Sequence, residues 1–232
     1  MIRSAAPVWL FDLDNTLHDA ASHVFVELNR SIGAFVQREL QLSEEESNAL
    51  RHHYWQRYGA TLLGLVRHHG IRAAHFLHDT HRLPGLEAQI SGHRHDFVAL
   101  KALPGRKFIL TNGPRAYALR VLRALRIEHL FDGVLAVEDM VCFGQWRPKP
   151  DARMLRCIAV RLGVHPSRCV LVEDTLQHQK SARRVGMGTV WMQRYARINP
   201  YGGHVERWSK RPAYVDRVVR ALRPLRRGSV RP

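Results

Sequence analysis

The stretch that most constrains this chain is Val8–Leu17, where an apolar run leads directly into two carboxylates. Val8–Phe11 is continuously apolar, and Asp12, Asp14 and Thr16 follow it at alternate positions. A short apolar run without alternation is typical of a strand that is covered on both faces of a parallel sheet. In open parallel sheets ligands bind beyond the carboxyl ends of the strands, so Asp12 and Asp14 are candidate site residues. The same residues also fit a polar turn that binds nothing, and this stretch alone does not separate the two interpretations.

The composition is that of a globular protein. The 232 residues allow one large domain or a core with a smaller insert, and the chain is 45% hydrophobic and 24% charged. No apolar run approaches the roughly 18 residues that a membrane-spanning helix needs. The segment before Val8 is too short and too weakly apolar for a signal peptide. We therefore expect a cytoplasmic protein with no membrane partner.

The formal net charge of +16 is the unusual feature of the composition. It fits attraction to a polyanion such as nucleic acid, and equally an enzyme whose substrate is a small anion. The arginines are spread along the chain except near its end, where four occur without an acidic neighbour: Arg223, Arg226, Arg227 and Arg231. We expect this basic tail to be a solvated, frayed terminus.

The cysteines give no sign of a disulfide framework or a zinc site. Cys142, Cys157 and Cys169 are odd in number and lack paired spacing. We expect them to be small buried hydrophobic residues.

Between residues 18 and 102 the pattern is helical throughout and contains no strand signal. Ser43 and Glu46 form a plausible capping box. The predicted helices run over 24–40, 44–58, 61–69 and 72–81, and Pro84 with Gly85 interrupts the pattern. Such a block between two strands predicts an inserted helical cap.

From Pro104 the pattern alternates between strand and helix. Strands are predicted at 108–110, 134–137, 170–172 and 189–191, and helices at 115–125, 152–162 and up to about 185. Asp151 is a candidate N-cap and Gly186 a candidate helix stop. This alternation predicts an α/β fold with a doubly wound, Rossmann-like parallel sheet. The expected division is a catalytic core of residues 1–17 and 103–232 and a helical cap of residues 18–102.

Three of these strands end in residues that suit a phosphate or a divalent metal ion. Hydrolysis of a phosphate monoester needs an anionic nucleophile, cations that offset charge repulsion, donors for the phosphoryl oxygens and a proton carrier. We assign Asp12 as nucleophile and Asp14 as general acid and base. Thr111 and the backbone N–H of Asn112 are candidate phosphate ligands. The remaining candidates are Lys149, for catalysis and phosphate binding, and Asp174 with Glu173, for Mg²⁺.

Each of these groups alone also has a purely structural interpretation. Thr111 and Asn112 fit a turn before Pro114, Lys149 fits a solvated charge, and Glu173 with Asp174 fits a helix cap. Their order and their placement at strand ends favour the functional interpretation. The four segments that carry it are 12–17, 110–112, 147–151 and 172–174.

In these four segments the chain resembles the haloacid dehalogenase superfamily of aspartate-nucleophile phosphatases. The resemblance implies an aspartyl-phosphate on Asp12 and an Mg²⁺ ion held by Asp12, Asp174 and the backbone carbonyl of Asp14. Dehalogenases of the superfamily have no acid at the position of Asp14, so the resemblance implies a phosphatase. One departure is His178, where relatives place Asn or Asp. Imidazole is a poor ligand for a hard cation, so either Glu173 or water substitutes, or His178 supports the metal ligands indirectly.

Within the superfamily, the chain resembles the pyrimidine 5′-nucleotidase subfamily in residues 11–18, in residues 54–62 with 64–65, and in residues 110–114. This similarity implies a small-molecule nucleotide substrate of the UMP or CMP type rather than nucleic acid. Tyr54, Arg57 and Tyr58 are the candidate base-binding residues, although aromatic residues in such helices more often serve packing. The oligomeric state is expected to be a monomer or a homodimer.

Other interpretations of the chain stay open. A sibling enzyme such as a phosphoglycolate phosphatase or a sugar-phosphate mutase shares the core and differs in its cap. A nucleic-acid-binding protein without turnover would also use the basic surface. Nine of the fifteen histidines lie between His52 and His95, and we expect a polar cap surface there rather than a zinc site.

Overall fold

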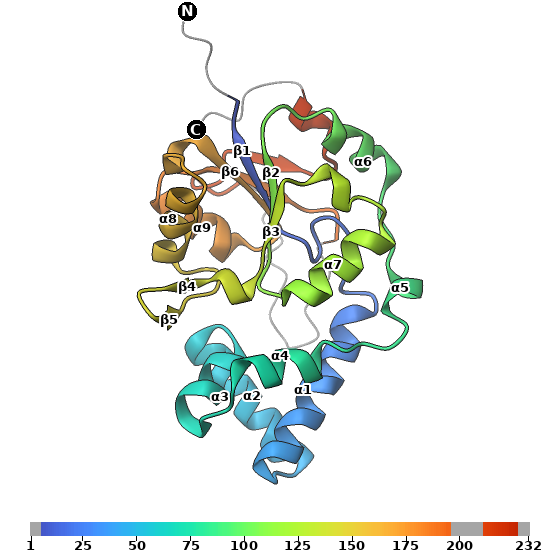
Figure 1. Cartoon of the computed structure of the whole chain (residues 1–232), viewed down its shortest axis with the longest axis vertical. Coiled ribbons are helices and arrows are strands. Elements are labelled where there is room, and N and C mark those ends of the chain that lie inside the picture. The colour runs from blue at the N-terminus through green and yellow to red at the C-terminus, as the bar shows by residue number, and fades with distance from the viewer. Residues whose placement is uncertain (1–5, 196–210, 227–232) are drawn as a thin grey trace, which may run out of the picture. The chain divides into compact units, whose positions relative to one another are not determined.

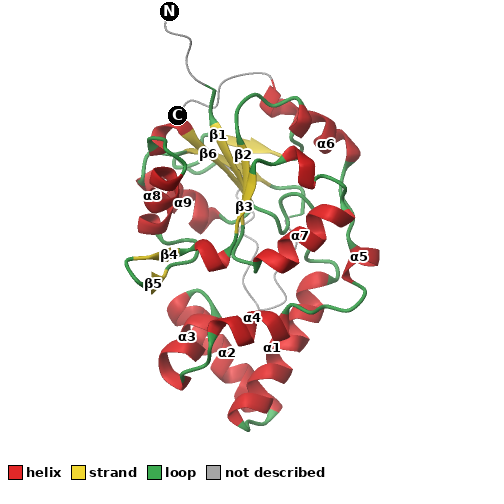
Figure 2. Ribbon diagram, in the orientation of Figure 1, coloured by secondary structure: helices red, strands yellow, loops and turns green. Residues whose placement is uncertain are grey.

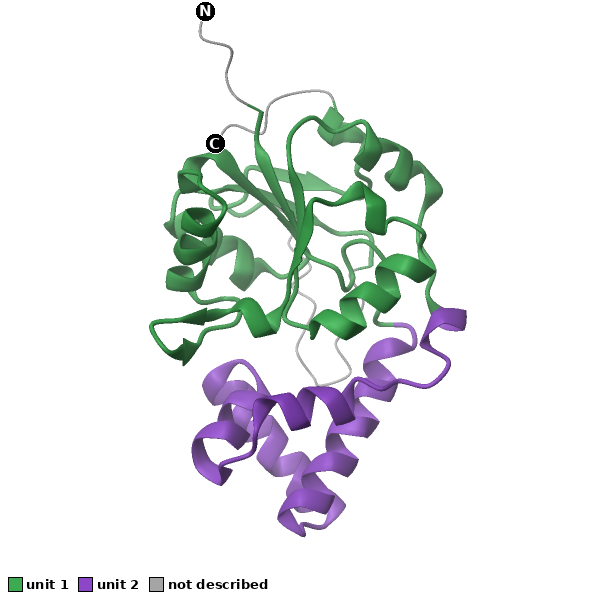
Figure 3. Ribbon diagram, in the orientation of Figure 1, with its two compact units in different colours: residues 1–21, 90–232 green, residues 22–89 purple. Residues whose placement is uncertain are grey.

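The computed structural model describes residues 6–195 and 211–226 of the chain. It divides into two compact units, residues 1–21 with 90–232 and residues 22–89 (Figure 3).

Unit 1 is built on a six-stranded parallel sheet with the order β3-β2-β1-β6-β7-β8 (Figure 1). Its strands are β1 (Val8–Phe11), β2 (Lys107–Leu110), β3 (Gly133–Leu135), β6 (Cys169–Glu173), β7 (Gly188–Met192) and β8 (Arg217–Val219). The doubly wound α/β prediction is confirmed. Two predictions about strands are corrected: β3 ends at Leu135 because Val137 begins a 3₁₀ helix, and β8 was not predicted.

The register of the sheet brings the polar strand ends to one rim. Phe11 lies opposite Ile109 on one side and Val172 on the other. All residues of β1 and β6 are buried, because these strands lie in the middle of the sheet and are covered on both faces. The residues that follow Phe11, Leu110 and Val172 therefore emerge together.

Helices cover both faces of the sheet (Figure 2). On one face lie α8 (Ala152–Arg161) and α9 (Leu176–Arg184), and α7 (Arg115–Ala124) lies on the other. The core under α8 combines its Met154, Leu155 and Ile158 with strand residues such as Leu10 and Leu171. Short 3₁₀ helices connect the elements: η1 (Glu128–Leu130), η2 (Val137–Asp139), η3 (Pro166–Arg168) and η4 (Arg223–Arg226).

Unit 2 is entirely helical. It contains α1 (Val24–Leu40), α2 (Glu44–Tyr58), α3 (Thr61–His69), α4 (Ala73–Thr80) and α5 (Leu86–Gln89), so the four longer helices match their predictions closely. The capping box is confirmed: the Glu46 N–H donates to Ser43 Oγ at 3.2 Å, and the Ser43 N–H donates to Glu46 Oε2 at 2.8 Å. The ring of Tyr54 on α2 packs over Gly64 on α3, where a Cβ would lie 2.1 Å from the ring.

Helix α6 (Arg94–Lys101) belongs to unit 1, whereas the sequence pattern placed it in the inserted block. Its buried Asp96 forms an ion pair with Arg194 and accepts a hydrogen bond from the Leu222 N–H at 2.8 Å. These partners lie about a hundred residues away in sequence. The division between the units therefore falls at residue 89 rather than at 102.

The structure corrects the interpretation of the cysteines. Cys142 and Cys157 form a disulfide, and only Cys169 is free and buried as expected. Cys142 belongs to a small hairpin of β4 (Val141–Cys142) and β5 (Gln145–Trp146) that packs against α8, which carries Cys157. This packing brings the two thiols together, and their spacing in the sequence gave no sign of it.

The basic terminus is also more ordered than expected. Arg223–Arg226 form η4, and the Leu225 side chain within it is buried. Arg227 and Arg231 lie outside the described residues. Within the described ranges, no helix is both long enough and apolar enough to cross a membrane.

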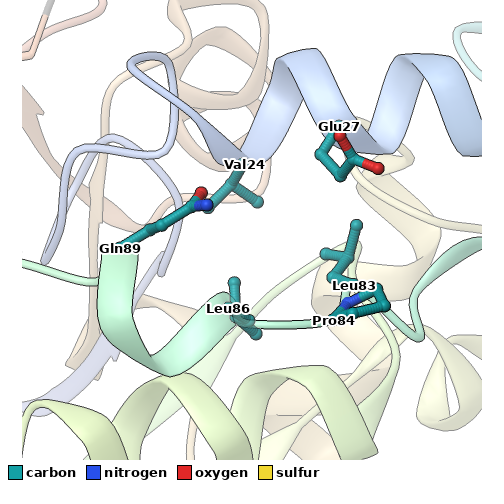
Figure 4. A pocket seen from close by; sticks show the side chains of 6 residues that line it. All are labelled: Val24, Glu27, Leu83, Pro84, Leu86 and Gln89. Carbon is teal, nitrogen blue, oxygen red and sulfur yellow. The ribbon is translucent and has the colours of Figure 1, made fainter.

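A small pocket lies within unit 2 between α1 and α5 (Figure 4). Its lining residues are Val24, Glu27, Leu83, Pro84, Leu86 and Gln89. Glu27, the one carboxylate among them, pairs with Arg30 at 3.0 Å. This lining offers no set of reactive side chains, so the candidate chemistry lies at the rim of the sheet in unit 1.

Candidate active site

Asp12 is fixed immediately after β1. Its N–H donates to the Val172 carbonyl at 2.9 Å, which extends the pairing of β1 with β6 by one residue. The chain then turns sharply, with Asn15 in the left-handed region at φ 56°, a conformation that asparagine tolerates better than most residues. This turn returns the Thr16 hydroxyl to Asp12, and it donates to Asp12 Oδ2 at 3.0 Å. Asp12 is therefore buried, oriented and close to the rim.

Lys149 links the ends of two strands. Its Nζ donates to Asp12 Oδ1 at 2.6 Å and to Glu173 Oε2 at 2.7 Å, and its side chain is 2% exposed. Buried charges persist in proteins when they are paired and hydrogen-bonded. The interpretation of Lys149 as a solvated surface charge is therefore wrong.

The three buried charges determine one another's pKa values. Burial, together with the negative charge of Glu173, raises the pKa of Asp12 to about 7, although the Lys149 ammonium acts in the opposite direction. For Glu173, burial is outweighed by the charges of Lys149 and His178, and its pKa falls below its ordinary value. For Lys149, burial is outweighed by the two carboxylates, and its pKa is raised. Lys149 therefore stays charged at neutral pH. The lowered pKa of Glu173 and the raised pKa of Asp12 show that Glu173 is the carboxylate that keeps its negative charge beside Lys149.

Glu173 is held from several directions. The Thr175 N–H donates to Oε1 at 3.2 Å, while Oε2 is 3.0 Å from the His178 Nδ1 atom and also accepts from Lys149. Its side chain is 1% exposed. His178 on α9 thus lies against the carboxylate that holds Lys149. This contact agrees with the alternative in which His178 supports the site indirectly.

Asp12, Glu173 and Asp174 form the group of side chains that can hold a metal ion in the described part of the chain. One oxygen from each lies within 4.8 Å of the others. Burial and the charges of Glu173 and Asp12 raise the pKa of Asp174 well above its ordinary value. The raised pKa values of Asp12 and Asp174 reflect burial and the mutual repulsion of these acids, which a bound cation would relieve, and oxygen donors are those that Mg²⁺ prefers. The donor set therefore fits a hard divalent cation.

Thr111 and Asn112 follow β2 at the same rim. The Gly113 N–H donates to Thr111 Oγ1 at 2.9 Å, and Thr111 itself is buried. The Asn112 side chain makes two hydrogen bonds to the backbone of Lys149, as donor to its carbonyl and as acceptor from its N–H, both at 2.9 Å. The sequence assigned Asn112 only through its backbone N–H, and this role of its side chain was missed.

Asp14 has two partners that the sequence analysis did not name. His18 Nε2 lies 2.9 Å from Asp14 Oδ1, and the Tyr117 hydroxyl donates to the same oxygen at 2.5 Å. Burial and the charge of Asp14 raise the pKa of Tyr117 well above 10, so its hydroxyl stays protonated and remains a donor. His18 lies four residues after Asp14 and could have been noticed in the sequence. Tyr117 lies 103 residues away and could not.

The other sequence candidates belong to unit 2. Tyr54, Arg57 and Tyr58 belong to α2 in unit 2, where Tyr54 is 5% exposed and donates or accepts a 2.7 Å hydrogen bond with His69. Arg57 Nε donates to Tyr58 Oη at 3.0 Å, and Arg57 is exposed. The ring of Tyr54 is thus mainly a packing surface, and base binding by these three residues stays a prediction.

The fold and the rim define an α/β protein with a buried carboxylate, a buried lysine and acidic side chains that can hold a metal ion at the ends of parallel strands. A family model, haloacid dehalogenase-like hydrolase, matches residues 8–186. The chain belongs to this family.

Curated relatives carry different activities in their names. The chain is 26% identical over 202 residues to Phosphate metabolism protein 8 of Saccharomyces cerevisiae. The aligned region covers 80% of this chain and 61% of the yeast protein. It is 25% identical over 197 residues to (S)-2-haloacid dehalogenase 4A of Burkholderia cepacia, covering 80% and 82% of the two chains. The chain spans only about three fifths of the length of the yeast relative.

Solved structures share the fold. CbbY from Rhodobacter sphaeroides in complex with phosphate has a TM-score of 0.61 at 19% identity, with 95% and 96% of the chains covered. YfnB from Bacillus subtilis, in a structure bound to magnesium, has a TM-score of 0.58 at 16% identity, with 96% and 97% covered. At these identities the likeness establishes the fold alone.

Proposed function

We propose that this protein is an Mg²⁺-dependent phosphomonoesterase that acts through an aspartyl-phosphate on Asp12. The observation that carries the proposal is the buried Asp12–Lys149–Glu173 group, in which Lys149 Nζ lies 2.6 Å from Asp12 and 2.7 Å from Glu173. A carboxylate that attacks an anionic phosphoryl group needs a cation beside it. Glu173 holds the Lys149 ammonium in place, and its own carboxylate is buried away from solvent.

Asp12, Asp174 and the backbone carbonyl of Asp14 would hold the Mg²⁺ ion. When bound, the ion supplies positive charge that offsets the repulsion between the carboxylates and the phosphate. Glu173 is less suited to direct ligation than the sequence analysis proposed, because Lys149, Thr175 and His178 already surround its carboxylate. Its proposed role is to position Lys149.

Asp14 would transfer the protons. It follows Asp12 by two residues on the same turn, and its side chain is 19% exposed, whereas Asp12 is 8% exposed. In the first step a carboxylate oxygen of Asp12 bonds to phosphorus, the bond to the leaving oxygen breaks, and Asp14 protonates that oxygen. In the second step Asp14 takes a proton from water as the water oxygen bonds to phosphorus and Asp12 is released.

The substrate class that we propose is a small nucleoside monophosphate, with pyrimidine nucleotides first. Support comes from the resemblance of residues 11–18, 54–62 with 64–65, and 110–114 to the pyrimidine 5′-nucleotidases, and from the exposed Arg57 beside Tyr58 on α2. A guanidinium and a phenol are groups that bind a nucleobase by stacking and hydrogen bonding.

The test is phosphate release from a panel of substrates with and without Mg²⁺. The panel contains UMP, CMP, AMP, fructose 1-phosphate, phosphoglycolate and a 2-haloacid, the last assayed for halide release. We expect UMP and CMP to give the highest kcat/KM, and Asp12→Asn to abolish turnover. Preference for a sugar phosphate or a purine nucleotide would overturn the substrate class. Halide release in place of phosphate release would overturn the phosphatase assignment, and phosphate release that persists in EDTA would overturn the proposed dependence on Mg²⁺.

A further inference from the structure

Two buried side chains that the proposed function does not use, His18 and Tyr117, contact Asp14. His18 is fully buried and Tyr117 is 3% exposed, yet both direct a polar atom at the same oxygen, Asp14 Oδ1. The other carboxylate oxygen, Oδ2, has no hydrogen-bond partner among the described residues. The two oxygens of Asp14 are therefore not equivalent.

The backbone also keeps the His18 ring next to Asp14. Asp14 and His18 also pair through their backbones in an isolated bridge that closes the turn after β1. The other ring nitrogen, Nδ1, is buried and has no hydrogen-bond partner within residues 6–195 and 211–226. A buried polar atom costs free energy when it is left unsatisfied, so this arrangement is retained at an energetic cost.

We infer that His18 and Tyr117 are positioning residues that hold Asp14 by Oδ1 and thereby leave Oδ2 as the oxygen that carries the transferred proton. The inference rests on the proposed phosphatase function and adds the means by which that proton is placed. Because two donors occupy Oδ1, the proton of the neutral Asp14 carboxyl group is carried by Oδ2. Oδ2 gives this proton to the leaving oxygen as its bond to phosphorus breaks, and takes one from water in the second step.

Tyr117→Phe tests the inference because it removes one hydroxyl and keeps the ring. Without the Tyr117 donor, Asp14 can rotate and share its proton between both oxygens. A substrate with a basic alkoxide leaving group depends on protonation, whereas p-nitrophenyl phosphate has a leaving group that departs without it. We expect kcat for UMP to fall by about tenfold or more at nearly unchanged KM, since positioned acid catalysis contributes roughly 10²–10⁴-fold. The burst of p-nitrophenol from one turnover should change less than threefold.

The matched control is Tyr195→Phe, the same change at another buried tyrosine of unit 1, whose hydroxyl has no hydrogen-bond partner in the described part of the chain. It should leave both rates unchanged. Equal loss for UMP and for the p-nitrophenol burst in Tyr117→Phe would indicate a merely structural role and would overturn the inference. If the wild-type protein hydrolyses neither compound, it is the proposed function that fails.

A second measurement does not depend on turnover. Long-range ¹H–¹⁵N NMR spectra of the wild-type protein report which nitrogen of the His18 imidazole is protonated. We expect a proton on Nε2, the atom that faces Asp14, whatever the state of Nδ1. A neutral ring protonated only at Nδ1 could not donate to Asp14 and would overturn the inference even in an active enzyme.

Discussion

The side-chain amide of Asn112 forms a closed pair of hydrogen bonds with the backbone of Lys149, 37 residues later in the chain. Asn112 follows β2, so this pair ties the loop that carries Lys149 to the end of a central strand. The backbone of Lys149 is thereby fixed at the place from which its Nζ reaches both Asp12 and Glu173.

Asn112→Ala should therefore disturb catalysis through Lys149. Loss of both bonds leaves the Lys149 N–H and carbonyl without these partners, and we expect the free energy of unfolding to fall by about 1–3 kcal/mol. We expect kcat to fall by about 10–100-fold, because small displacements of a catalytic group have effects of this size. Denaturant unfolding and steady-state kinetics measure the two effects. Asn48→Ala on the surface of α2 is the control and should change neither, and an unchanged kcat in Asn112→Ala would contradict the positioning role.

Asp12→Asn should make the metal-free protein more stable at pH 8, although it removes the nucleophile. The pKa of Asp12 is raised to about 7 by burial and by Glu173. Between pH 4 and 7 the folded protein therefore binds more protons than the unfolded chain, so the stability of the wild type falls as pH rises through this window. Asparagine resembles the protonated acid and removes this loss, which we expect to be roughly 2–4 kcal/mol at pH 8.

Urea unfolding in EDTA at pH 4.5, 6 and 8 measures this difference. The two proteins should be similar at pH 4.5 and should diverge as pH rises. Addition of Mg²⁺ should stabilise the wild type by mass action and the variant much less, since the variant lacks one ligand charge. Parallel pH profiles in EDTA would show that Asp12 does not carry a raised pKa, and equal stabilisation by Mg²⁺ would exclude Asp12 from the metal site.

Asp151→Ala should destabilise α8. Asp151 Oδ1 accepts from the N–H groups of Arg153 at 2.7 Å and Met154 at 3.2 Å, and Oδ2 pairs with Arg147 at 2.9 Å. Loss of an N-cap of this kind costs about 1 kcal/mol. Although burial acts against ionisation, the Arg147 and backbone donors lower the pKa of Asp151. The stabilisation of the folded protein by ionised Asp151 is therefore complete above the pKa of the unfolded chain, which is near 4. It is lost as the pH falls through the lower pKa of the folded protein.

Thermal unfolding of Asp151→Ala and Asp151→Asn at pH 7 and pH 3 separates the two contributions. Asn keeps an oxygen for capping and should lose less stability than Ala at pH 7. The difference between the wild type and Asp151→Ala should be smaller at pH 3, and a larger difference at pH 3 would contradict the lowered pKa.

Gly64→Ala should destabilise unit 2, although alanine normally stabilises a helix relative to glycine by about 1 kcal/mol. The new Cβ would lie 2.1 Å from the Tyr54 ring, which is buried between α2 and α3. Overpacking of this kind costs about 1–3 kcal/mol. Gly33→Ala on α1 is the matched control, because the nearest atom there is the flexible end of Arg51 at 2.9 Å. Urea unfolding should show a loss of stability for Gly64→Ala and no loss for Gly33→Ala, and a stabilised Gly64→Ala would show that α2 and α3 separate easily.

Much of the fold was predictable because single elements carry their own signals. The apolar run of β1, the capping box at Ser43 and the helical spacing of α1 each report burial along one segment. β8 escaped prediction because it is short and begins with an arginine, and its strand state depends on pairing with β7.

The sequence by itself determined the alternation of strands and helices, and the polar residues at the strand ends. It therefore predicted that Asp12, Thr111 and Asp174 lie in one region, because parallel strands end at a common rim, and the family resemblance added Lys149 to them. Only the tertiary structure decided which atoms meet. The Tyr117 contact with Asp14, the Asn112 clamp on Lys149 and the pairing of Cys142 with Cys157 each join separate elements. Periodicity describes which side of an element is buried, whereas these contacts depend on the register and packing of one element against another.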